Sequence, residues 1–234
     1  DPFFKIKNPP FQIPERVLVL MPDFIGDAVL LTPFLRNLRK NLGNDTVIDI
    51  VCKEPVKNLL ATFPYINSIY SQNIVKHYKI KFLKQKKYDT VFNLMQSVYW
   101  GIAVKRAKVR QRVVINLDRI GLNMPTMLKN LCTHLLSSTT INDKKPQLMV
   151  NLNYLKELNL QVYNNYPEII ILDSDRIKAQ KISENIKGKK AIIHVTAGSL
   201  GKEWDLENWV EIIKYLNKNN YELISTGTII DREK

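Results

Sequence analysis

The sequence feature that most constrains the fold is the stretch Arg16–Leu42, which joins an apolar run to an amphipathic one. Its first part, RVLVLM, is short and almost wholly apolar, which is typical of a strand buried on both faces of a parallel sheet. After the turn Pro22–Asp27, leucines recur at helical spacing with basic residues between them. A buried strand, a tight turn and an amphipathic helix indicate the first unit of an α/β domain, whose functional groups gather where the strands end.

Asp27 follows the buried strand closely, and the residues alone leave two interpretations of it open. Its carboxylate is either a chemical group at the strand end or the N-cap of the helix. Pro33 leaves the start of that helix open too. The helix begins either at Asp27, with a kink at the proline, or at Thr32, with the proline in its first turn.

Strand-like and helix-like stretches alternate along most of the chain, which predicts right-handed βαβ crossovers and a parallel sheet. A basic helix is expected over 74–87. The alternation pauses over two helical stretches, 122–138 and 148–160, which have no strand between them. It resumes after Asn164–Pro167, first with a strand expected over 168–172.

These patterns divide the chain into an irregular lead-in and two α/β domains. The second is shorter than the roughly 100–150 residues usual for a domain, so its sheet is predicted to be incomplete. The predicted ranges are 1–15 for the lead-in, 16–166 for the N-terminal domain and 167–234 for the first part of the C-terminal domain.

A second informative stretch is the loop Thr196–Glu203, which follows an apolar run. Its small residues let backbone N–H groups approach an anion, its hydroxyls add donors, and Lys202 adds a positive charge. A P-loop is excluded, because the spacing of Gly198 and Gly201 is too short and glutamate follows Lys202. The loop is either an anion site or only a tight turn between a strand and a helix.

Asp231 is the third candidate, since it lies four residues after the glycine that ends an apolar run at Gly227. A carboxylate at such a position accepts hydrogen bonds from both hydroxyls of a ribose. An ordinary helix N-cap is the equally good alternative on the sequence alone.

The formal net charge of +13 favours an acidic partner: nucleic acid, an anionic membrane surface or a phosphorylated substrate. Six lysines lie within 76–87, either as a binding patch or as a solvated helix face. No apolar run reaches the roughly 18 residues of a membrane span, and residues 1–7 are too polar for a signal peptide. Cys52 and Cys132 show no metal-ligand spacing, which favours a reduced, cytoplasmic setting.

The Gly26-Asp27 turn, the Thr196-Ala197-Gly198-Ser199 loop with Lys202-x-Trp204, and the Gly227…Asp231 pair resemble the signatures of one family. This family is the ADP-heptose:lipopolysaccharide heptosyltransferases, and the resemblance covers residues 16–233. It implies a GT-B fold of two Rossmann-like parallel-sheet domains, the N-terminal one for the acceptor and the C-terminal one for the nucleotide-sugar.

The resemblance further implies an inverting glycosyltransferase that uses neither a bound metal ion nor a cofactor. It would move heptose or a related sugar from a nucleotide-sugar, with ADP-heptose expected, to the lipopolysaccharide core. The other expected partners are a phosphorylated glycolipid acceptor and an anionic membrane surface, and no nucleic acid. The expected place is the cytoplasm, with peripheral contact to the inner face of the inner membrane.

Residue roles also follow from the resemblance. Asp27 is expected to be the general base, and Asp23 and Gly26 belong to the turn on the acceptor side. The family's later Asp-Ser-Gly stretch followed by His has no counterpart before Lys234, so the C-terminal domain is predicted to be truncated and the chain alone inactive. The residues expected to bind the donor are Thr196, Gly198, Ser199, Lys202 and Asp231.

Two other functions fit the residues less well. One is a GT-B transferase that uses another donor. The other is a basic nucleic-acid-binding module without catalysis, which requires aromatic side chains interleaved with the basic ones. Only Tyr78 and Phe82 lie among the lysines of 76–87.

Overall fold

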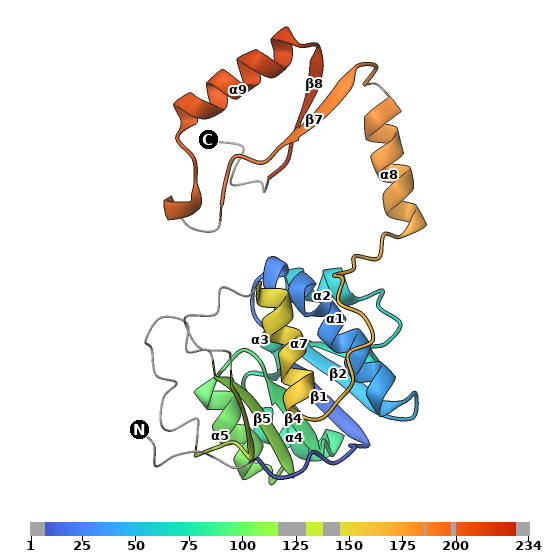
Figure 1. Ribbon diagram of the computed structural model, residues 1–234, viewed down its shortest axis with the longest axis vertical. Coiled ribbons are helices and arrows are strands. Elements are labelled where there is room, and N and C mark those ends of the chain that lie inside the picture. Colours follow the sequence, from blue (N-terminus) through green and yellow to red (C-terminus); the bar gives the residue numbers. More distant parts are fainter. Residues whose placement is uncertain (1–7, 117–129, 138–145, 185, 198–199, 228–234) are drawn as a thin grey trace. The chain divides into compact units, whose positions relative to one another are not determined.

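The computed structural model describes residues 8–116, 130–137, 146–184, 186–197 and 200–227 (Figure 1). The chain forms two compact units, Asp1–Ile170 and Ile171–Lys234. Each unit is described by itself. In the described residues, no helix is long and apolar enough to span a membrane.

The first unit is built on a six-stranded parallel sheet with the strand order β3-β2-β1-β4-β5-β6. This confirms the α/β class expected from the alternating pattern. The order reverses beside β1, since the chain adds β2 and β3 on one side and then β4 to β6 on the other. Ligand sites of such sheets lie at the carboxyl ends of the strands near this switch point. The strands are β1 (Arg16–Leu20), β2 (Val47–Cys52), β3 (Ser68–Ser71), β4 (Thr90–Asn93), β5 (Gln111–Asn116) and β6 (His134–Ser137).

Helices cover both faces of this sheet, and β1 shows why. Val17 and Val19 join the core under α1, α2 and α7, whereas Leu18 and Leu20 join the core under α3, α4 and α5. Because successive side chains of a strand point to opposite faces, an unbroken apolar run requires two such cores. The helices are α1 (Ile25–Leu42), α2 (Glu54–Leu60), α3 (Gln72–Val75), α4 (Lys79–Lys86), α5 (Val98–Arg106) and α7 (Gln147–Glu157).

Helix α1 begins earlier than either alternative drawn from the sequence. Its N-cap is Phe24, so Asp27 lies in its first turn and is not the cap. Pro33 lies inside the helix, where it has no N–H for the carbonyl of Val29. The hydroxyl of Thr32 donates to that carbonyl at 2.8 Å, which compensates for the missing backbone hydrogen bond.

Three local expectations were wrong. The stretch 122–138, expected to be helical, contains the edge strand β6, and short apolar runs fit either period. The basic segment 74–87 is divided between two short helices, α3 and α4. Residues 168–172 do not form a strand.

The segment 161–170, named here the strap, is held along α1 by side chains of that helix. Arg36 donates to the side chain of Asn164 at 2.7 Å and to the carbonyl of Tyr166 at 2.7 Å, and it forms an ion pair with Glu168. The side chain of Asn37 accepts the N–H of Tyr163 at 2.7 Å. These contacts replace the strand pairing that the sequence suggested for the end of the strap.

The second unit contains a small βαβ arrangement in which β7 and β8 pair in parallel. Among its described residues the sheet has two strands, in line with the incomplete sheet that the sequence predicts. Ile193 is buried, while Ile192, Leu206 and Tyr215 are exposed. The elements are α8 (Asp173–Glu184), β7 (Lys189–Ile193), the 3-10 turn η1 (Leu200–Lys202), α9 (Leu206–Lys218) and β8 (Tyr221–Ser225).

Candidate active site

A pocket of about 140 Å³ lies at the carboxyl ends of β1, β4 and β5, where the sheet reverses its order. The first turns of α1 and α7 close it. Its walls are mostly apolar, and its polar groups come from the two helices. The lining residues are Pro22, Asp27, Leu31, Leu94, Ile115, Gln147 and Asn151.

Asp27 is the acidic side chain of this pocket. It is exposed, and within the described residues no hydrogen bond or ion pair engages its carboxylate. Asp27 lies in the first turn of α1, where the helix dipole interacts favourably with an acidic side chain. An exposed, unpaired carboxylate at the rim of a pocket is free to accept a proton from a bound hydroxyl.

The other two residues of the expected acceptor turn lie beside Asp27. Asp23 forms an ion pair with Lys53 at 2.8 Å, which links the segments that follow β1 and β2. Gly26 lies in the first turn of α1 and has open space where a Cβ would lie: apart from its chain neighbours and the nearby backbone of the helix, no described atom is within 4 Å. Packing within the described residues therefore gives no reason for a glycine there, whereas a ligand that approaches the backbone would.

Two pocket residues, Gln147 and Asn151, were missed by the sequence reasoning. The amide of Gln147 donates to the side chain of Asn151 at 2.8 Å, and Asn151 donates to the carbonyl of Leu30 at 3.0 Å. The side-chain oxygen of Gln147 is buried and has no described partner. The sequence did hold one indication of them. Gln147 and Asn151 are four residues apart, and Asn151 shares the buried face of α7 with Tyr154 and Leu155.

The second unit carries the loop expected to bind the donor. Thr196 is half-buried and Lys202 is exposed, and no described carboxylate pairs with Lys202. The two ends of the loop are joined by a hydrogen bond of 3.3 Å from the N–H of Ala197 to the carboxylate of Glu203. Three further expected donor residues, Gly198, Ser199 and Asp231, lie outside the described residues.

Asp23, Gly26 and Asp27 thus lie in the first unit, and Thr196 and Lys202 lie in the loop of the second. In the described parts of the chain, no three His, Cys, Asp or Glu side chains are grouped as metal ligands.

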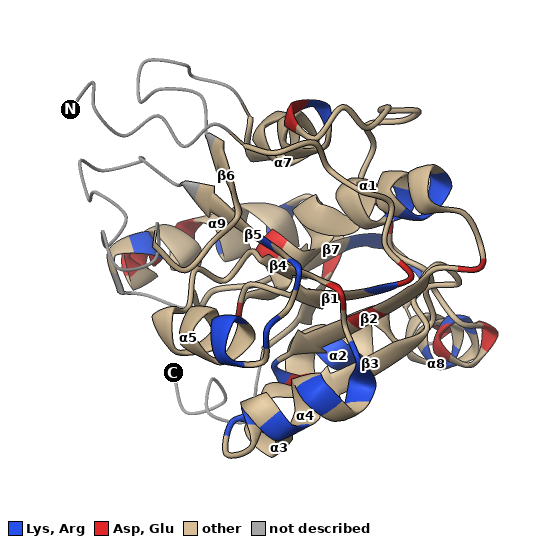
Figure 2. Cartoon of the chain, turned by 90° about the horizontal axis from the view of Figure 1, so that it is seen from below, with Lys and Arg blue, Asp and Glu red and all other residues tan. Residues whose placement is uncertain are grey.

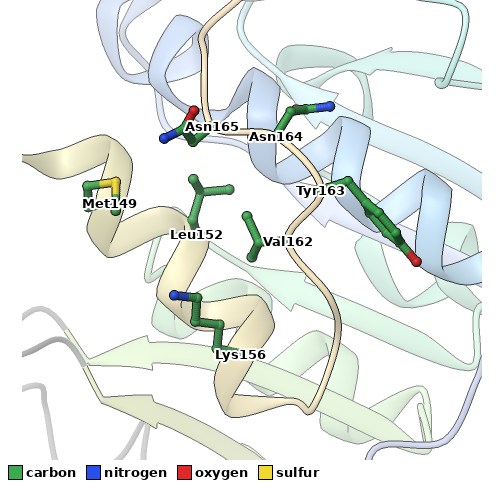
Figure 3. Close-up of a pocket in the computed structure, with 7 residues that line it drawn as sticks. All are labelled: Met149, Leu152, Lys156, Val162, Tyr163, Asn164 and Asn165. Atoms are coloured by element: carbon green, nitrogen blue, oxygen red, sulfur yellow. The ribbon is translucent and has the colours of Figure 1, made fainter.

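Another pocket, of about 380 Å³, lies between α7 and the strap (Figure 3). Lys156 is its one ionisable group besides Tyr163, and the rest of its wall is apolar or amide. It offers no carboxylate or imidazole for acid–base chemistry, so it is not the candidate active site. The lining residues are Met149, Leu152, Lys156, Val162, Tyr163, Asn164 and Asn165.

Comparison with known proteins agrees with the motifs. No family model matches the chain. The chain is similar to lipopolysaccharide heptosyltransferase 3 of Escherichia coli strain K12, with 23% identity over 217 residues. The match covers 86% of this chain and 60% of the relative, so the chain spans well under two thirds of the relative's length.

Solved structures show the same fold. The ADP-heptose lipopolysaccharide heptosyltransferase II of E. coli superposes with a TM-score of 0.71 at 16% identity, over 93% of this chain and 66% of that one. A glycosyl transferase of family 9 from Veillonella parvula gives 0.75 at 17% identity, over 94% and 64%. E. coli heptosyltransferase WaaC with ADP gives 0.64 at 16% identity, over 93% and 69%. The resemblance to heptosyltransferases and the GT-B type of fold are confirmed.

Proposed function

We propose that the protein is an inverting glycosyltransferase that moves heptose, or a related sugar, from a nucleotide-sugar to the lipopolysaccharide core. One observation carries this proposal: the unpaired carboxylate of Asp27 lines a pocket at the carboxyl edge of the sheet. It does so in a chain whose relatives are named heptosyltransferases.

The proposed reaction is a single displacement. A hydroxyl of the acceptor enters the pocket, and its oxygen attacks the anomeric carbon of the donor while Asp27 takes its proton. The bond from the anomeric carbon to the diphosphate breaks, and its electron pair leaves with the nucleoside diphosphate. Attack opposite the leaving group inverts the anomeric centre.

The donor is assigned to the second unit. Positive charge and N–H donors stabilise a leaving diphosphate, and the exposed amine of Lys202 together with the loop after β7 supplies them. In this proposal Thr196, Gly198 and Ser199 bind the pyrophosphate and Asp231 binds the ribose, on the strength of the motifs. The solved structure of E. coli heptosyltransferase WaaC with ADP supports a nucleoside diphosphate there. No metal ion or cofactor takes part in the proposed scheme.

The acceptor is assigned to the first unit. The unpaired side-chain oxygen of Gln147 accepts a hydrogen bond from one sugar hydroxyl, which leaves a neighbouring hydroxyl to Asp27. A phosphorylated glycolipid suits a protein with a net charge of +13. It would meet the protein at the cytoplasmic face of a membrane.

The test is product analysis with the purified protein, a core glycolipid acceptor and a panel of nucleotide-sugars, with and without EDTA. Transfer from ADP-heptose that continues in EDTA is expected. Preference for another nucleotide-sugar would favour the alternative GT-B transferase, and activity restored only by a divalent cation would contradict the metal-free scheme. If the protein transfers no sugar but binds RNA with an affinity that falls steeply as the salt concentration rises, it is a nucleic-acid-binding module instead.

A further inference from the structure

A second groove, of about 280 Å³, lies on the opposite face of the sheet from α1 and α7, between α4 and α5. Lys and Arg residues lie along α4 and at the end of α5 (Figure 2). We call it the basic groove. Its lining residues are Lys76, His77, Tyr78, Lys79, Ile80, Lys81, Tyr99, Ile102, Ala103 and Arg106.

The positive charge around the basic groove is almost uncompensated along the sequence. From residue 55 to residue 117 the chain contains a single acid, Asp89. Its carboxylate accepts the N–H of Glu15 at 2.8 Å and lies 3.8 Å from Arg110, away from the groove. The basic residues of this stretch are Lys57, Lys76, Lys79, Lys81, Lys84, Lys86, Lys87, Lys105, Arg106, Lys108, Arg110 and Arg112.

The basic groove is lined by four Lys and Arg side chains. Among the described residues, no carboxylate forms an ion pair with Lys76, Lys79, Lys81 or Arg106. Burial, and next repulsion by the charge of Lys76, lower the pKa of the Lys79 amine. This amine donates to the carbonyl of Lys76 and lies 5.5 Å from the centroid of the Trp100 ring. An anion in the groove would relieve this repulsion.

The rim of the basic groove is apolar and aromatic. Tyr99 is 79% exposed and Tyr78 is 41% exposed, and both line the groove. Ile74, two residues before Lys76 of the lining, is 62% exposed and is counted with the rim. Tyrosines with exposed rings, mixed with lysine and arginine, are the side chains that proteins place at the boundary between headgroups and acyl chains. A free phosphate would use the cations and leave this rim without a partner.

The size and position of the basic groove also favour a membrane surface. A volume of 280 Å³ suits one or two headgroups and is short for a nucleic-acid strand that follows a groove over several nucleotides. Helices α3 and α5 follow the ends of β3 and β4. Ile74 and Tyr99 therefore lie toward the carboxyl edge of the sheet, the edge that also carries Asp27.

We propose that the basic groove and its rim, Ile74, Tyr78 and Tyr99, dock on the surface of an anionic phospholipid bilayer. The lysines and Arg106 bind lipid phosphates, and the exposed rings enter the headgroup layer. This inference deepens the proposed function, because a glycolipid acceptor would be met at that surface. Docking itself needs no sugar transfer, so the two proposals fail separately.

The test is co-sedimentation of the purified protein with vesicles of phosphatidylglycerol and phosphatidylcholine, or of phosphatidylcholine alone. The variant Lys76→Gln/Lys81→Gln removes two exposed cations of the groove. The matched variant Lys40→Gln/Lys156→Gln lowers the net charge equally on the α1 and α7 face. Each cation removed from the groove should weaken binding to anionic vesicles about fivefold, so the groove variant should bind them roughly 20- to 30-fold more weakly. The matched variant should bind them less than about threefold more weakly.

A third variant, Tyr99→Ser, tests the rim. It should lose the part of vesicle binding that survives in about 0.5 M salt, where attraction between charges is screened. Thermal unfolding of each variant checks that the fold is intact. Equal losses in the two double variants would mean diffuse attraction and overturn the proposal. It is also overturned if the protein binds both kinds of vesicle equally, or binds RNA through the groove and no vesicle.

Discussion

Asp49 is a charged residue whose place in the fold depends on one tyrosine. It lies in β2, 2% exposed, and it accepts a hydrogen bond of 2.7 Å from the hydroxyl of Tyr88. Its other oxygen has no described partner, and the guanidinium of Arg16 is 4.0 Å away. Burial and then the hydrogen bond to Asp49 raise the pKa of Tyr88, so the phenol stays protonated and keeps donating.

We expect Tyr88→Phe to lower the free energy of unfolding by about 1–3 kcal/mol, because it leaves a buried carboxylate without its closest donor. Tyr65→Phe is the matched control, since the hydroxyl of Tyr65 is buried and has no described partner. It should change the free energy by less than about 0.5 kcal/mol. Urea denaturation followed by circular dichroism measures both, and equal effects would contradict the role given to the Tyr88 hydrogen bond.

Single residues also show what the sequence can indicate about the site. The position of Asp27 after a buried strand follows from local pattern, and the structure places it at the pocket. Gln147 could not be found in this way, because tertiary packing, mainly against α1, decides where α7 lies at the sheet. The assignments of Asp27 as a base and of Lys202 as a donor ligand stay predictions.

At the scale of elements, α1 depends on Thr32 to carry a proline in its interior. The hydroxyl of Thr32 donates to the carbonyl of Val29 at 2.8 Å and accepts the N–H of Glu168 at 2.9 Å. The same oxygen therefore replaces the backbone hydrogen bond lost at Pro33 and binds the strap to α1. Thr32 is fully buried, so water cannot replace either bond.

We expect Thr32→Val to cost about 1–3 kcal/mol of stability, since the carbonyl of Val29 and the N–H of Glu168 both lose their partner at a buried side chain. Thr62→Val is the control, because the hydroxyl of Thr62 is buried without a described partner. Chemical denaturation compares the two variants. A Thr32→Val protein as stable as Thr62→Val would show that the hydroxyl is dispensable in α1.

Elements were predicted well where the pattern is long and periodic, and poorly where tertiary contacts decide. The strands β1 and β2 and the long helix α1 follow from apolar runs and leucine spacing. The strand predicted over 168–172 was wrong. Its apolar run is typical of a strand, but the hydrogen bonds of the strap beside it go to Arg36 and Thr32.

At the scale of the whole molecule, two compact units are joined just after the strap. Tyr163 and Tyr166 are exposed, yet the backbone at both is held by α1. Leu172 is also exposed, but its carbonyl accepts the N–H groups of Asp175 at 3.0 Å and Arg176 at 3.0 Å in the first turn of α8. Proteases cut where backbone is both exposed and free to move.

Brief digestion with chymotrypsin is therefore expected to cut late after Tyr163 and Tyr166, although both side chains are exposed. The variant Arg36→Gln should speed cleavage after Tyr166, because it removes the hydrogen bond to that carbonyl and the ion pair with Glu168. Mass spectrometry of the early fragments reads the order. First cuts after Tyr163 or Tyr166 in the unchanged protein would contradict the anchoring of the strap.

The parallel sheet of the first unit could be derived from alternation alone. The domain boundaries 16–166 and 167–234 stay a prediction from the sequence. The compact units of the structure divide after Ile170. The sequence could not supply this division, since it depends on which helix the strap contacts.

The central claim is that Asp27 is the general base of a glycosyl transfer, and the variant Asp27→Asn tests it most directly. Rates of sugar transfer and the affinity for the nucleotide-sugar are measured for the unchanged protein, for Asp27→Asn and for Asp45→Asn, an exposed acid elsewhere in the first unit. We expect Asp27→Asn to lower the rate about 10²- to 10⁴-fold and to keep donor affinity within about twofold, while Asp45→Asn changes neither. A rate near that of the unchanged protein in Asp27→Asn would contradict the claim.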